Sequence, residues 1–430
     1  MATTLHKRHP QSRAKAGTLV AALDIGSTKV ACLIGRVDPL VPEGFAYLGG
    51  GRQQSRGFEC GRITDIEALE RSIRLAVEDA EREAGERIDR VILGVSGPHL
   101  QSDLVDVETQ LGEREITTRD VRKLWAQAMS KHVSRDRELL SAFPVSYGVD
   151  DQSEISEPVG MIGDYLAARV HLVSAPKSLI SNLRECLSRA HLEVEQIVPS
   201  AIASAAGSLI DDELENGGIC VDLGGSMTTV SVFQKGIPAW TGVIRIGGGH
   251  VTRDLAQGIG TTFAAAERVK TLYGTADLEG PGLAERVEAP RLGDDGRLKA
   301  DRMARGDLAA MIHPRIEETF ELVGDLIAKC PLEMIPHRLV LTGGASQLPG
   351  VRDVSSSSLN VPLRLGRPTS ADILSEKFAN PAFSTAAGLL SYQLRGFTEA
   401  VRAGAATATT GGTTGGRLVR RVLDWIRDNF

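Results

Sequence analysis

The chain has 430 residues, of which 42% are hydrophobic and 24% charged, values typical of a soluble globular protein with two or more domains. A net charge of −6 and an aromatic content of 4% argue against a nucleic-acid partner. A chain with net negative charge does not attract phosphates in general, and few aromatic side chains are present to stack on bases. The five cysteines are scattered and odd in number, which favours reduced core residues of a cytosolic protein over disulfides or a zinc site.

The N-terminal segment 1–17 is basic and lacks an apolar run, which predicts a disordered lead-in rather than a signal peptide. The longest uncharged stretch, 196–210, is too short to cross a bilayer. From residue 18 onward, strand-like and helical patterns alternate, which predicts α/β layers.

The first candidate site is a turn between two apolar, strand-like runs within residues 19–35. The first run stops at Asp24, in the pattern Asp-x-Gly, and the turn that follows is rich in small and polar residues. Glycine lets backbone N–H groups approach an anion, and an aspartate can hold a hydrated Mg²⁺. The candidate residues are Asp24, Gly26, Ser27, Thr28 and Lys29.

A helix at 65–84 and a short strand at 91–95 follow this hairpin. The sequence pattern changes at residues 96–171, which hold a charged, amphipathic stretch at 118–131 and an irregular segment with several acidic and glycine residues. This change predicts an inserted small α+β subdomain. A further helix is expected at 179–190. The small-residue stretch 200–209 could let two helix backbones approach closely at a hinge, or could equally be a plain core helix.

A second turn of the same kind follows the apolar strand at 219–223. One such hairpin alone is usually an ordinary turn, but two that face one cleft would hold a triphosphate tail from both sides. The duplication therefore favours a nucleotide site with Mg²⁺ held near both aspartates, most simply through water. The candidate residues of this turn are Asp222, Gly224, Gly225 and Ser226.

Three later segments could complete a nucleoside site. Gly247 and Gly248 precede a helical pattern at 251–259 and offer a close backbone approach. Glu267 and Lys270 share a helix face and could bracket a ribose, although a solvated ion pair is the simpler interpretation. The strand 338–342 opens into Gly343 and Gly344, where an adenine could lie on bare backbone, although such turns are common. Residues 276–305 are predicted to be a surface excursion.

The C-terminal region combines a tether with an amphipathic helix. Residues 402–416 lack large apolar side chains and predict a flexible linker. In 417–430 the apolar side chains fall within about 160° of a helical wheel, which favours a membrane-surface helix over docking on protein. The apolar face is Leu418, Val419, Val422, Leu423, Trp425, Ile426 and Phe430, and the basic residues are Arg417, Arg420, Arg421 and Arg427.

The order of these pieces resembles the actin/Hsp70/sugar-kinase superfamily. Within it, the segments 57–66, 143–152, 158–163 and 170–175 resemble the FtsA family of bacterial cell division proteins. The resemblance implies an α/β, actin-like two-lobed fold with an inserted small α+β subdomain (1C) and a C-terminal amphipathic helix. The expected division is 1–17 basic N-terminus, 18–93 and 172–204 subdomain 1A, 94–171 subdomain 1C, 205–246 and 335–396 subdomain 2A, 247–334 subdomain 2B, 397–416 linker and 417–430 membrane-targeting helix.

The resemblance also implies roles. Lys29 would reach the phosphates of ATP, Asp24 and Asp222 would organise Mg²⁺, Glu267 and Lys270 would hold the ribose, and Gly343 and Gly344 the adenine. It further implies filaments of this chain on anionic lipid at the cytoplasmic side of the inner membrane, at the division site. FtsZ would bind through 2B, and later division proteins through 1C.

One position departs from the superfamily pattern. Val198 stands where Hsp70 and the actin-like MreB carry a glutamate before the hinge proline, and valine can neither accept a proton nor orient water. We therefore expect at most slow ATP hydrolysis. The alternatives are a small-molecule kinase on the same scaffold, which would need a carboxylate base that is not evident near the hinge, and a pilus-type adaptor, against which the tail argues.

Overall fold

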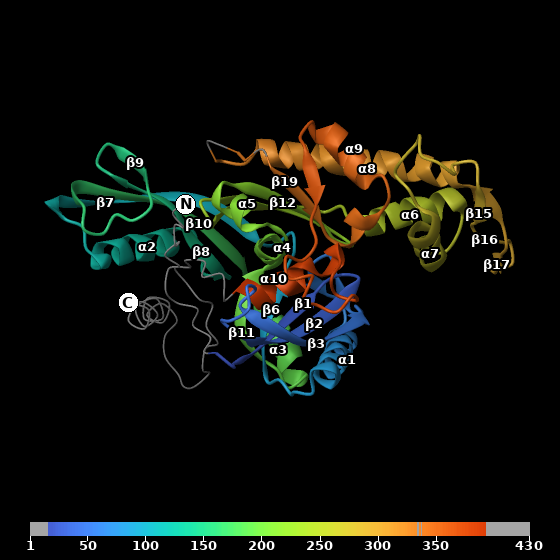
Figure 1. Cartoon of the computed structure of the whole chain (residues 1–430), viewed down its shortest axis with the longest axis horizontal. Helices are drawn as coiled ribbons and strands as arrows, with labels where there is room; N and C mark the ends of the chain where they lie inside the picture. Colours follow the sequence, from blue (N-terminus) through green and yellow to red (C-terminus); the bar gives the residue numbers. More distant parts are fainter. Residues whose placement is uncertain (1–15, 333–334, 337, 393–430) are drawn as a thin grey trace.

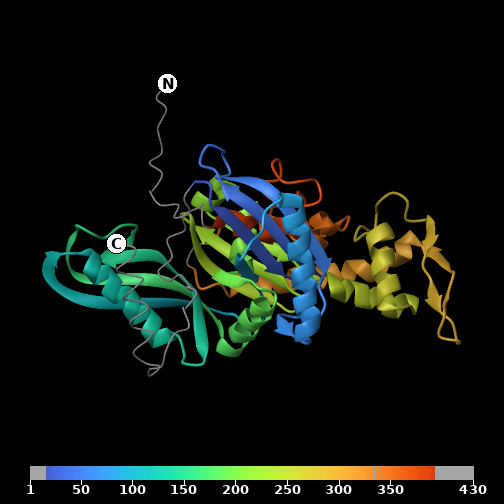
Figure 2. The ribbon, with the colours of Figure 1, turned by 90° about the horizontal axis from the view of Figure 1, so that it is seen from below.

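The computed structural model describes residues 16–332, 335–336 and 338–392, so the predicted linker and tail helix lie outside the described residues. The described chain forms an elongated molecule. The inserted domain with β7–β10 lies at one end of the long axis, and the β15–β17 region lies at the other (Figure 1). The view from below keeps this arrangement (Figure 2).

The first lobe is built on a five-stranded mixed sheet of order β11-β6-β1-β2-β3. Helix α1 (Ile66–Ala84) covers one face; it begins where Asp65 accepts the N–H groups of Glu67 and Ala68, and it ends at Gly85 with φ +67°. Helix α3 (Lys177–Arg189) packs beside it, and a two-stranded ladder, β4 (Phe58–Glu59) with β5 (Arg62–Ile63), precedes α1. The strands of the sheet are β1 (Leu19–Ile25), β2 (Lys29–Val37), β3 (Phe45–Gln54), β6 (Arg90–Val95) and β11 (Glu193–Pro199).

The second lobe repeats this topology with a sheet of order β14-β13-β12-β19-β20. In both sheets, three strands joined by hairpins run antiparallel, and two further strands add in parallel on the other side. The two predicted Asp-x-Gly hairpins are therefore confirmed as equivalent turns of two related sheets. The strands are β12 (Gly218–Leu223), β13 (Thr228–Gln234), β14 (Ile237–Ile244), β19 (Leu339–Thr342) and β20 (Leu363–Leu365).

The predicted insertion is a separate four-stranded antiparallel sheet of order β7-β10-β8-β9, with one helix on it. Its own core includes Leu124 and Trp125 of the helix against Leu166 and Ala168 of the central strand. The indole N–H of Trp125 donates to the Tyr147 hydroxyl at 2.8 Å, so this buried pair is satisfied. The elements are β7 (Gln101–Glu115), α2 (Thr118–His132), β8 (Arg137–Val149), β9 (Gln152–Ile155) and β10 (Ile162–Pro176).

The second lobe carries a helical extension between β14 and β19. The segment 276–305, predicted only as a surface excursion, also holds two short antiparallel ladders, β15–β18 and β16–β17. The elements are α6 (Gly248–Ile259), α7 (Phe263–Tyr273), β15 (Arg286–Glu288), β16 (Arg291–Leu292), β17 (Leu298–Lys299), β18 (Arg302–Ala304) and α8 (Arg305–Ala328). The remaining elements of this lobe are α5 (Asp211–Glu215), η1 (Gly344–Gln347), α9 (Val351–Leu359) and η2 (Pro381–Phe383).

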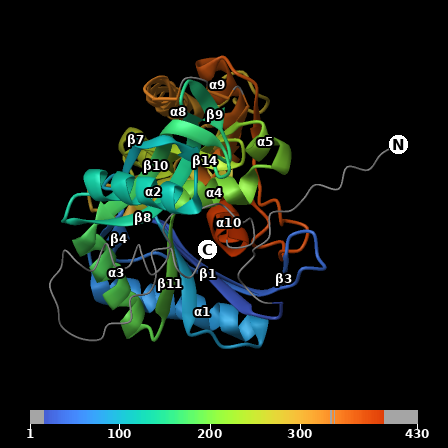
Figure 3. The same cartoon turned by 90° about the vertical axis from the view of Figure 1, so that its left-hand side faces the viewer.

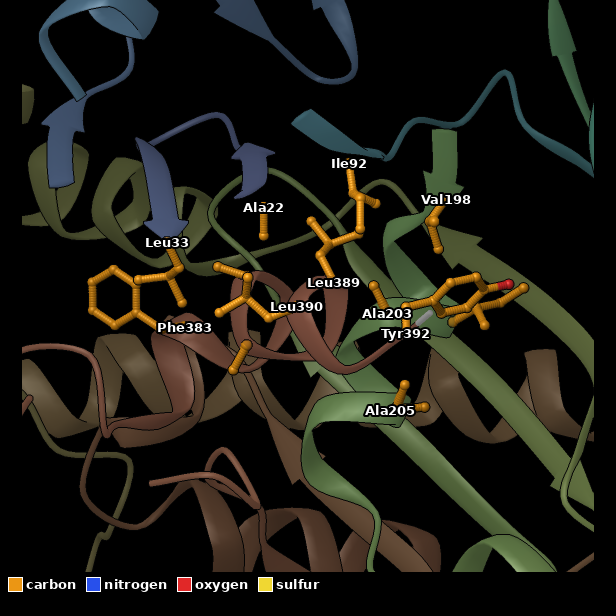
Figure 4. Close-up of a cluster of buried hydrophobic side chains, with 14 of the residues drawn as sticks. Ala22, Leu33, Ile92, Val198, Ala203, Ala205, Phe383, Leu389, Leu390 and Tyr392 are labelled. Atoms are coloured by element: carbon orange, nitrogen blue, oxygen red, sulfur yellow. The ribbon is translucent and has the colours of Figure 1, made fainter. Parts of the chain in front are cut away.

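Two short buried helices, α4 (Ser200–Ser208) and α10 (Ser384–Tyr392), cross between the sheets. A Cβ on Gly207 would lie 2.1 Å from the carbonyl oxygen of Ser384, and one on Gly388 would lie 1.8 Å from that of Ala203. Of the two interpretations left open for 200–209, the close approach of two helix backbones is therefore the one present. Figure 4 shows Ala22 and Ile92 of the first sheet facing Leu389 and Leu390 of α10. The same core cluster includes Cys220 and Val340 of the second sheet, so it joins the lobes.

None of the helices in the described part of the chain combines the length and apolarity that a bilayer crossing requires. All five cysteines are free; Cys60 is exposed and the other four are buried.

The inserted domain, which enters and leaves through the first lobe, also docks on β14 of the second lobe (Figure 3). His171 of β10 is fully buried there, with Nδ1 2.8 Å from the carbonyl oxygen of Pro238 and Nε2 2.8 Å from Ser102 Oγ. Ser102 Oγ in turn accepts the backbone N–H of Thr241 at 3.1 Å. Leu104 and Val145 add apolar contacts to the core of the second lobe.

This contact is expected to weaken in acid. Burial lowers the pKa of His171 from 6.5 to about 4, so the unfolded chain binds a proton more readily and stability falls as the pH drops through this window. The limit of this loss is about 3 kcal/mol, at about 1.4 kcal/mol for each pH unit. Chemical denaturation of the wild type and of His171→Asn at pH 5 and pH 7.5 measures it. The variant should be less stable at pH 7.5 and less sensitive to pH, and an equal pH response in both proteins would contradict the assignment.

Candidate nucleotide site

The two candidate turns have the same internal geometry. In the first, Gly26 N–H donates to the carbonyl oxygen of Lys29 at 2.9 Å, and in the second, Gly224 N–H donates to that of Met227 at 2.9 Å. Each aspartate sits one residue before the last paired position of its strand, Asp24 opposite Ala31 in β2 and Asp222 opposite Thr229 in β13. The shared register places the two carboxylates at equivalent points of the two lobes.

The turns meet across the boundary between the lobes. The hydroxyls of Ser27 and Ser226 lie 2.5 Å apart, although the residues are 199 positions apart in sequence. A Cβ on Gly225 would lie only 2.3 Å from Cγ2 of Thr28, so glycine at this position lets the two turns approach without displacing Thr28. The first and second turns thus form one surface of backbone and hydroxyl groups, which is the arrangement that an anion needs.

Asp24, Asp222 and Lys29 form one electrostatic group. Burial raises the pKa of Asp24 to about 6, while Lys29 lowers it and Asp222 raises it. Burial likewise raises the pKa of Asp222, and Lys29 opposes the shift. The two carboxylates therefore share one environment with a single ammonium, whose Nζ lies 5.1 Å from the centroid of the Phe383 ring.

This donor set fits a hydrated Mg²⁺. Asp24 is buried and Asp222 is half-buried, and with one lysine these two carboxylates leave an excess of negative charge that a divalent cation would relieve. Mg²⁺ uses few carboxylates and retains water and phosphate ligands, which matches two aspartates beside two phosphate-type turns. Among the described residues no group of three or more His, Cys, Asp or Glu side chains is placed to hold a metal ion.

The predicted ribose and adenine residues belong to the same cluster as the turns. Gly248 N–H donates to the Gly224 carbonyl oxygen at 2.9 Å, and Lys270 Nζ donates to the Gly248 carbonyl oxygen at 3.0 Å. Glu267 and Lys270 form an ion pair at 2.7 Å. Lys270 is well covered, with 15% of its side chain exposed, whereas 47% of Glu267 is exposed, so the carboxylate remains accessible to a ligand.

The glycine turn after β19 lies against the side chain of Asp222. Gly343 has φ +91°, and a Cβ there would lie 2.3 Å from Oδ1 of Asp222. On the adjoining side, a Cβ on Gly248 would lie 2.9 Å from that of Ala345 in η1. Gly247, whose own Cβ would lie 2.6 Å from the Gly224 carbonyl oxygen, completes this contact. The structure therefore brings all five predicted segments into one connected cluster.

Some members of the cluster were not predicted. Thr252 Oγ1 bonds both Glu267 and Lys270, the latter at 2.7 Å. Thr385 Oγ1 donates to Oδ2 of Asp222 at 3.2 Å from 163 residues away. The first lies four residues after Gly248 in the same helix and could have been found from that spacing, whereas no local pattern marks Thr385. Val198 is fully buried in the core cluster between the lobes (Figure 4), so its side chain contributes to the packing of this core.

Solved structures show the same fold at low sequence identity. A type IV pilus biogenesis complex of PilM and PilN matches at 15% identity with a TM-score of 0.64, covering 87% of this chain and 98% of that one. MreB5 of Spiroplasma citri bound to ADP matches at 12% identity with a TM-score of 0.53, covering 87% and 95%. These likenesses establish an actin-like fold.

Sequence comparison identifies the family. Residues 97–174 match the model of the SHS2 domain inserted in FtsA, and residues 219–388 match that of cell division protein FtsA. Cell division protein FtsA of Agrobacterium fabrum is 38% identical over 97% of this chain and 96% of its own length. With a relative this similar over almost the full length, the predicted resemblance is confirmed, and the chain belongs to the FtsA family of bacterial cell division proteins.

Proposed function

We propose that this protein binds Mg²⁺-ATP between its lobes and assembles into filaments on the cytoplasmic face of the inner membrane. The observation that carries the proposal is the single cluster formed by Asp24, Asp222, Lys29 and the two glycine turns. Lys29 would pair with phosphate oxygens, the turns would supply N–H and hydroxyl donors, and Gly343 and Gly344 would leave room for a flat base. Mg²⁺ would neutralise phosphate charge beside the two carboxylates.

The nucleotide acts mainly as a conformational ligand in this proposal. Residue 198 is a valine that is buried in the interlobe core. The hinge therefore has no carboxylate at the position where Hsp70 and MreB carry a glutamate that positions the attacking water. A bound nucleotide that contacts both lobes favours their closed arrangement, and this shift in population is its effect. ATP turnover is correspondingly slow.

The division of the chain into subdomains is part of the proposal. The first lobe is 1A (18–93 and 172–204), the insertion is 1C (94–171), the second lobe is 2A (205–246 and 335–396) and its extension is 2B (247–334). By its family, the protein tethers the FtsZ ring at the division site through 2B and recruits later division proteins through 1C. Filament contacts join copies of the chain.

Isothermal titration calorimetry of the full chain with ATP tests the nucleotide site. We expect one site per chain in Mg²⁺ and much weaker binding in EDTA, because the carboxylates of Asp24 and Asp222 then repel the phosphates. Heat that does not depend on Mg²⁺, or no binding at all, would contradict the proposal.

Membrane binding is expected to depend on residues 417–430. Burial of each large apolar side chain contributes up to about 1.5–3 kcal/mol, and each basic residue near anionic lipid about 1 kcal/mol. Helix formation opposes this by about 1–2 kcal/mol per residue, so one tail binds modestly and a filament of many tails binds strongly. Deletion of 417–430 should leave the protein in the supernatant with anionic liposomes.

The control is a tail of the same composition in scrambled order, which keeps the charge and destroys the apolar face. Sedimentation of the scrambled protein at the wild-type level would show that charge alone suffices and would refute the amphipathic helix.

A further inference from the structure

The ammonium group of Lys270 is saturated by contacts within the protein. It carries three N–H bonds, and three acceptors surround it. These are the carbonyl oxygen of Gly248 at 3.0 Å, Oγ1 of Thr252 at 2.7 Å and Oε2 of Glu267 at 2.7 Å. Only 15% of the Lys270 side chain is exposed. In this arrangement, a contact of Lys270 with a ribose would require one of the three hydrogen bonds to break.

Thr252 lies at the centre of this group and is fully buried in helix α6. Its Oγ1 accepts a hydrogen bond from Lys270 and can donate to Oε2 of Glu267 or, at 3.1 Å, to the carbonyl oxygen of Gly248. A hydroxyl has one hydrogen to donate, and the charged carboxylate is the stronger of these two acceptors. Thr252 and Lys270 therefore hold the same oxygen atom of Glu267.

The second carboxylate oxygen of Glu267 is available to a ligand. Both contacts of the carboxylate are made by Oε2, and Oε1 has no hydrogen-bond partner among the residues that the structure describes. The side chain is 47% exposed. A carboxylate that is fixed through one oxygen can accept a hydroxyl hydrogen with the other, and the sugar of a nucleotide presents such hydroxyls.

The same group is joined to the second candidate turn. The backbone of Gly248 accepts from Lys270 through its carbonyl oxygen and donates its N–H to the carbonyl oxygen of Gly224 at 2.9 Å. A Cβ on Gly248 would lie 3.8 Å from Nζ of Lys270, so the start of α6 also packs against this side chain. The carboxylate of Glu267 is therefore held at a defined position relative to the turn that would bind the phosphates.

We propose that Thr252 is a positioning residue for sugar recognition, an inference that rests on the proposed nucleotide site. Thr252 and Lys270 hold Oε2 of Glu267, and Oε1 of Glu267 accepts a hydroxyl of the ribose without help from Lys270. Glu267 then determines the preference for a ribonucleotide over a nucleotide that lacks sugar hydroxyls. Lys270 thus has a different role from the direct ribose contact that the family resemblance implies.

Calorimetric titration of the full-length protein with Mg²⁺-ATP and with Mg²⁺-2′,3′-dideoxy-ATP tests the proposal. We expect the wild type to bind ATP about tenfold more tightly, because the dideoxy nucleotide cannot form the charge-assisted hydrogen bond to Glu267. Thr252→Val keeps the shape and removes the hydroxyl. It should lose most of this preference while its affinity for the dideoxy nucleotide stays nearly unchanged. A purely structural role would weaken the binding of both nucleotides equally, and that result would overturn the proposal.

Two variants control for the loss of a buried hydroxyl. Thr252→Ser retains the hydroxyl and should keep the wild-type preference for ATP. Thr319→Val removes another buried hydroxyl, which donates to the carbonyl oxygen of Arg315 at 2.7 Å in helix α8, and it should bind both nucleotides as the wild type does. Loss of the preference in Thr252→Ser, or an equal loss in Thr319→Val, would overturn the role of the Thr252 hydroxyl.

Glu267→Ala tests which residue contacts the sugar. We expect this variant to bind ATP and the dideoxy nucleotide with equal affinity, and the full wild-type preference would overturn the assignment to Glu267. Failure of the nucleotide site itself gives a different result, because the wild type would then bind neither nucleotide and both proposals would fall. If the wild type bound both nucleotides equally well, the nucleotide site would stand and only the sugar contact would be refuted.

Discussion

Replacing Gly388 by alanine is expected to destabilise the protein by about 3 kcal/mol or more, one of the largest effects of any single methyl group in this chain. The added Cβ would lie 1.8 Å from the carbonyl oxygen of Ala203, and helix backbones cannot yield as a flexible side chain can. Helices α4 and α10 would have to separate, which would open the core that joins the two sheets.

The matched control is Gly324→Ala in helix α8, where the added Cβ would meet Leu359 at an ordinary 3.4 Å. This change should be neutral or stabilising by about 0.5–1 kcal/mol, because alanine favours a helix over glycine. Thermal and urea unfolding of the two variants and the wild type provide the comparison. Equal stability of the Gly388 and Gly324 variants would show that the crossing can relax, contrary to this account.

Asp222→Asn is expected to weaken Mg²⁺-dependent ATP binding about 100-fold. The substitution preserves shape but removes one of the two carboxylate charges that would hold hydrated Mg²⁺, and contacts to charged groups are worth about 1.5–3 kcal/mol each. The loss should vanish in EDTA, where neither protein can use the metal. Calorimetry with and without Mg²⁺ thus separates loss of the metal contact from general damage to the site.

Asp353→Asn, an exposed aspartate of helix α9, serves as the control and should bind Mg²⁺-ATP like the wild type. If Asp222→Asn lost the same affinity in EDTA as in Mg²⁺, the side chain would act through the fold and not through the metal.

A low pH should have the same effect as the substitution, since protonation of Asp24 at a pKa of about 6 also removes a negative charge. The affinity for Mg²⁺-ATP should therefore fall as the pH drops through 6.

The local parts of the site were readable from the sequence because their causes are local. A run of β-forming residues that stops at Asp24 or Asp222 and resumes after a glycine turn specifies a hairpin, and both hairpins are present. Helix α1 was readable from its apolar spacing. The partners of these elements were not readable in the same way.

Long-range partners depend on the packing of whole lobes. Thr385 reaches Asp222, and Gly388 meets Ala203, from a segment that no nearby pattern connects to either. The stretch around Ala203 was compatible equally with a close helix neighbour and with a plain core helix, and it could not identify α10. The ladders of 276–305 were missed because their strands have only two or three residues, too few to show a period of two.

The docking of the inserted domain has a mechanical consequence. The two halves of the molecule meet at the α4–α10 crossing and, away from it, at the His171 contact with β14, in addition to the contact between the phosphate turns. The second of these contacts ties the position of β14 to that of the inserted domain. A rotation of the second sheet that is driven from the phosphate turns must therefore either tilt the β7–β10 sheet at the far end of the molecule or break the contact of His171 with β14.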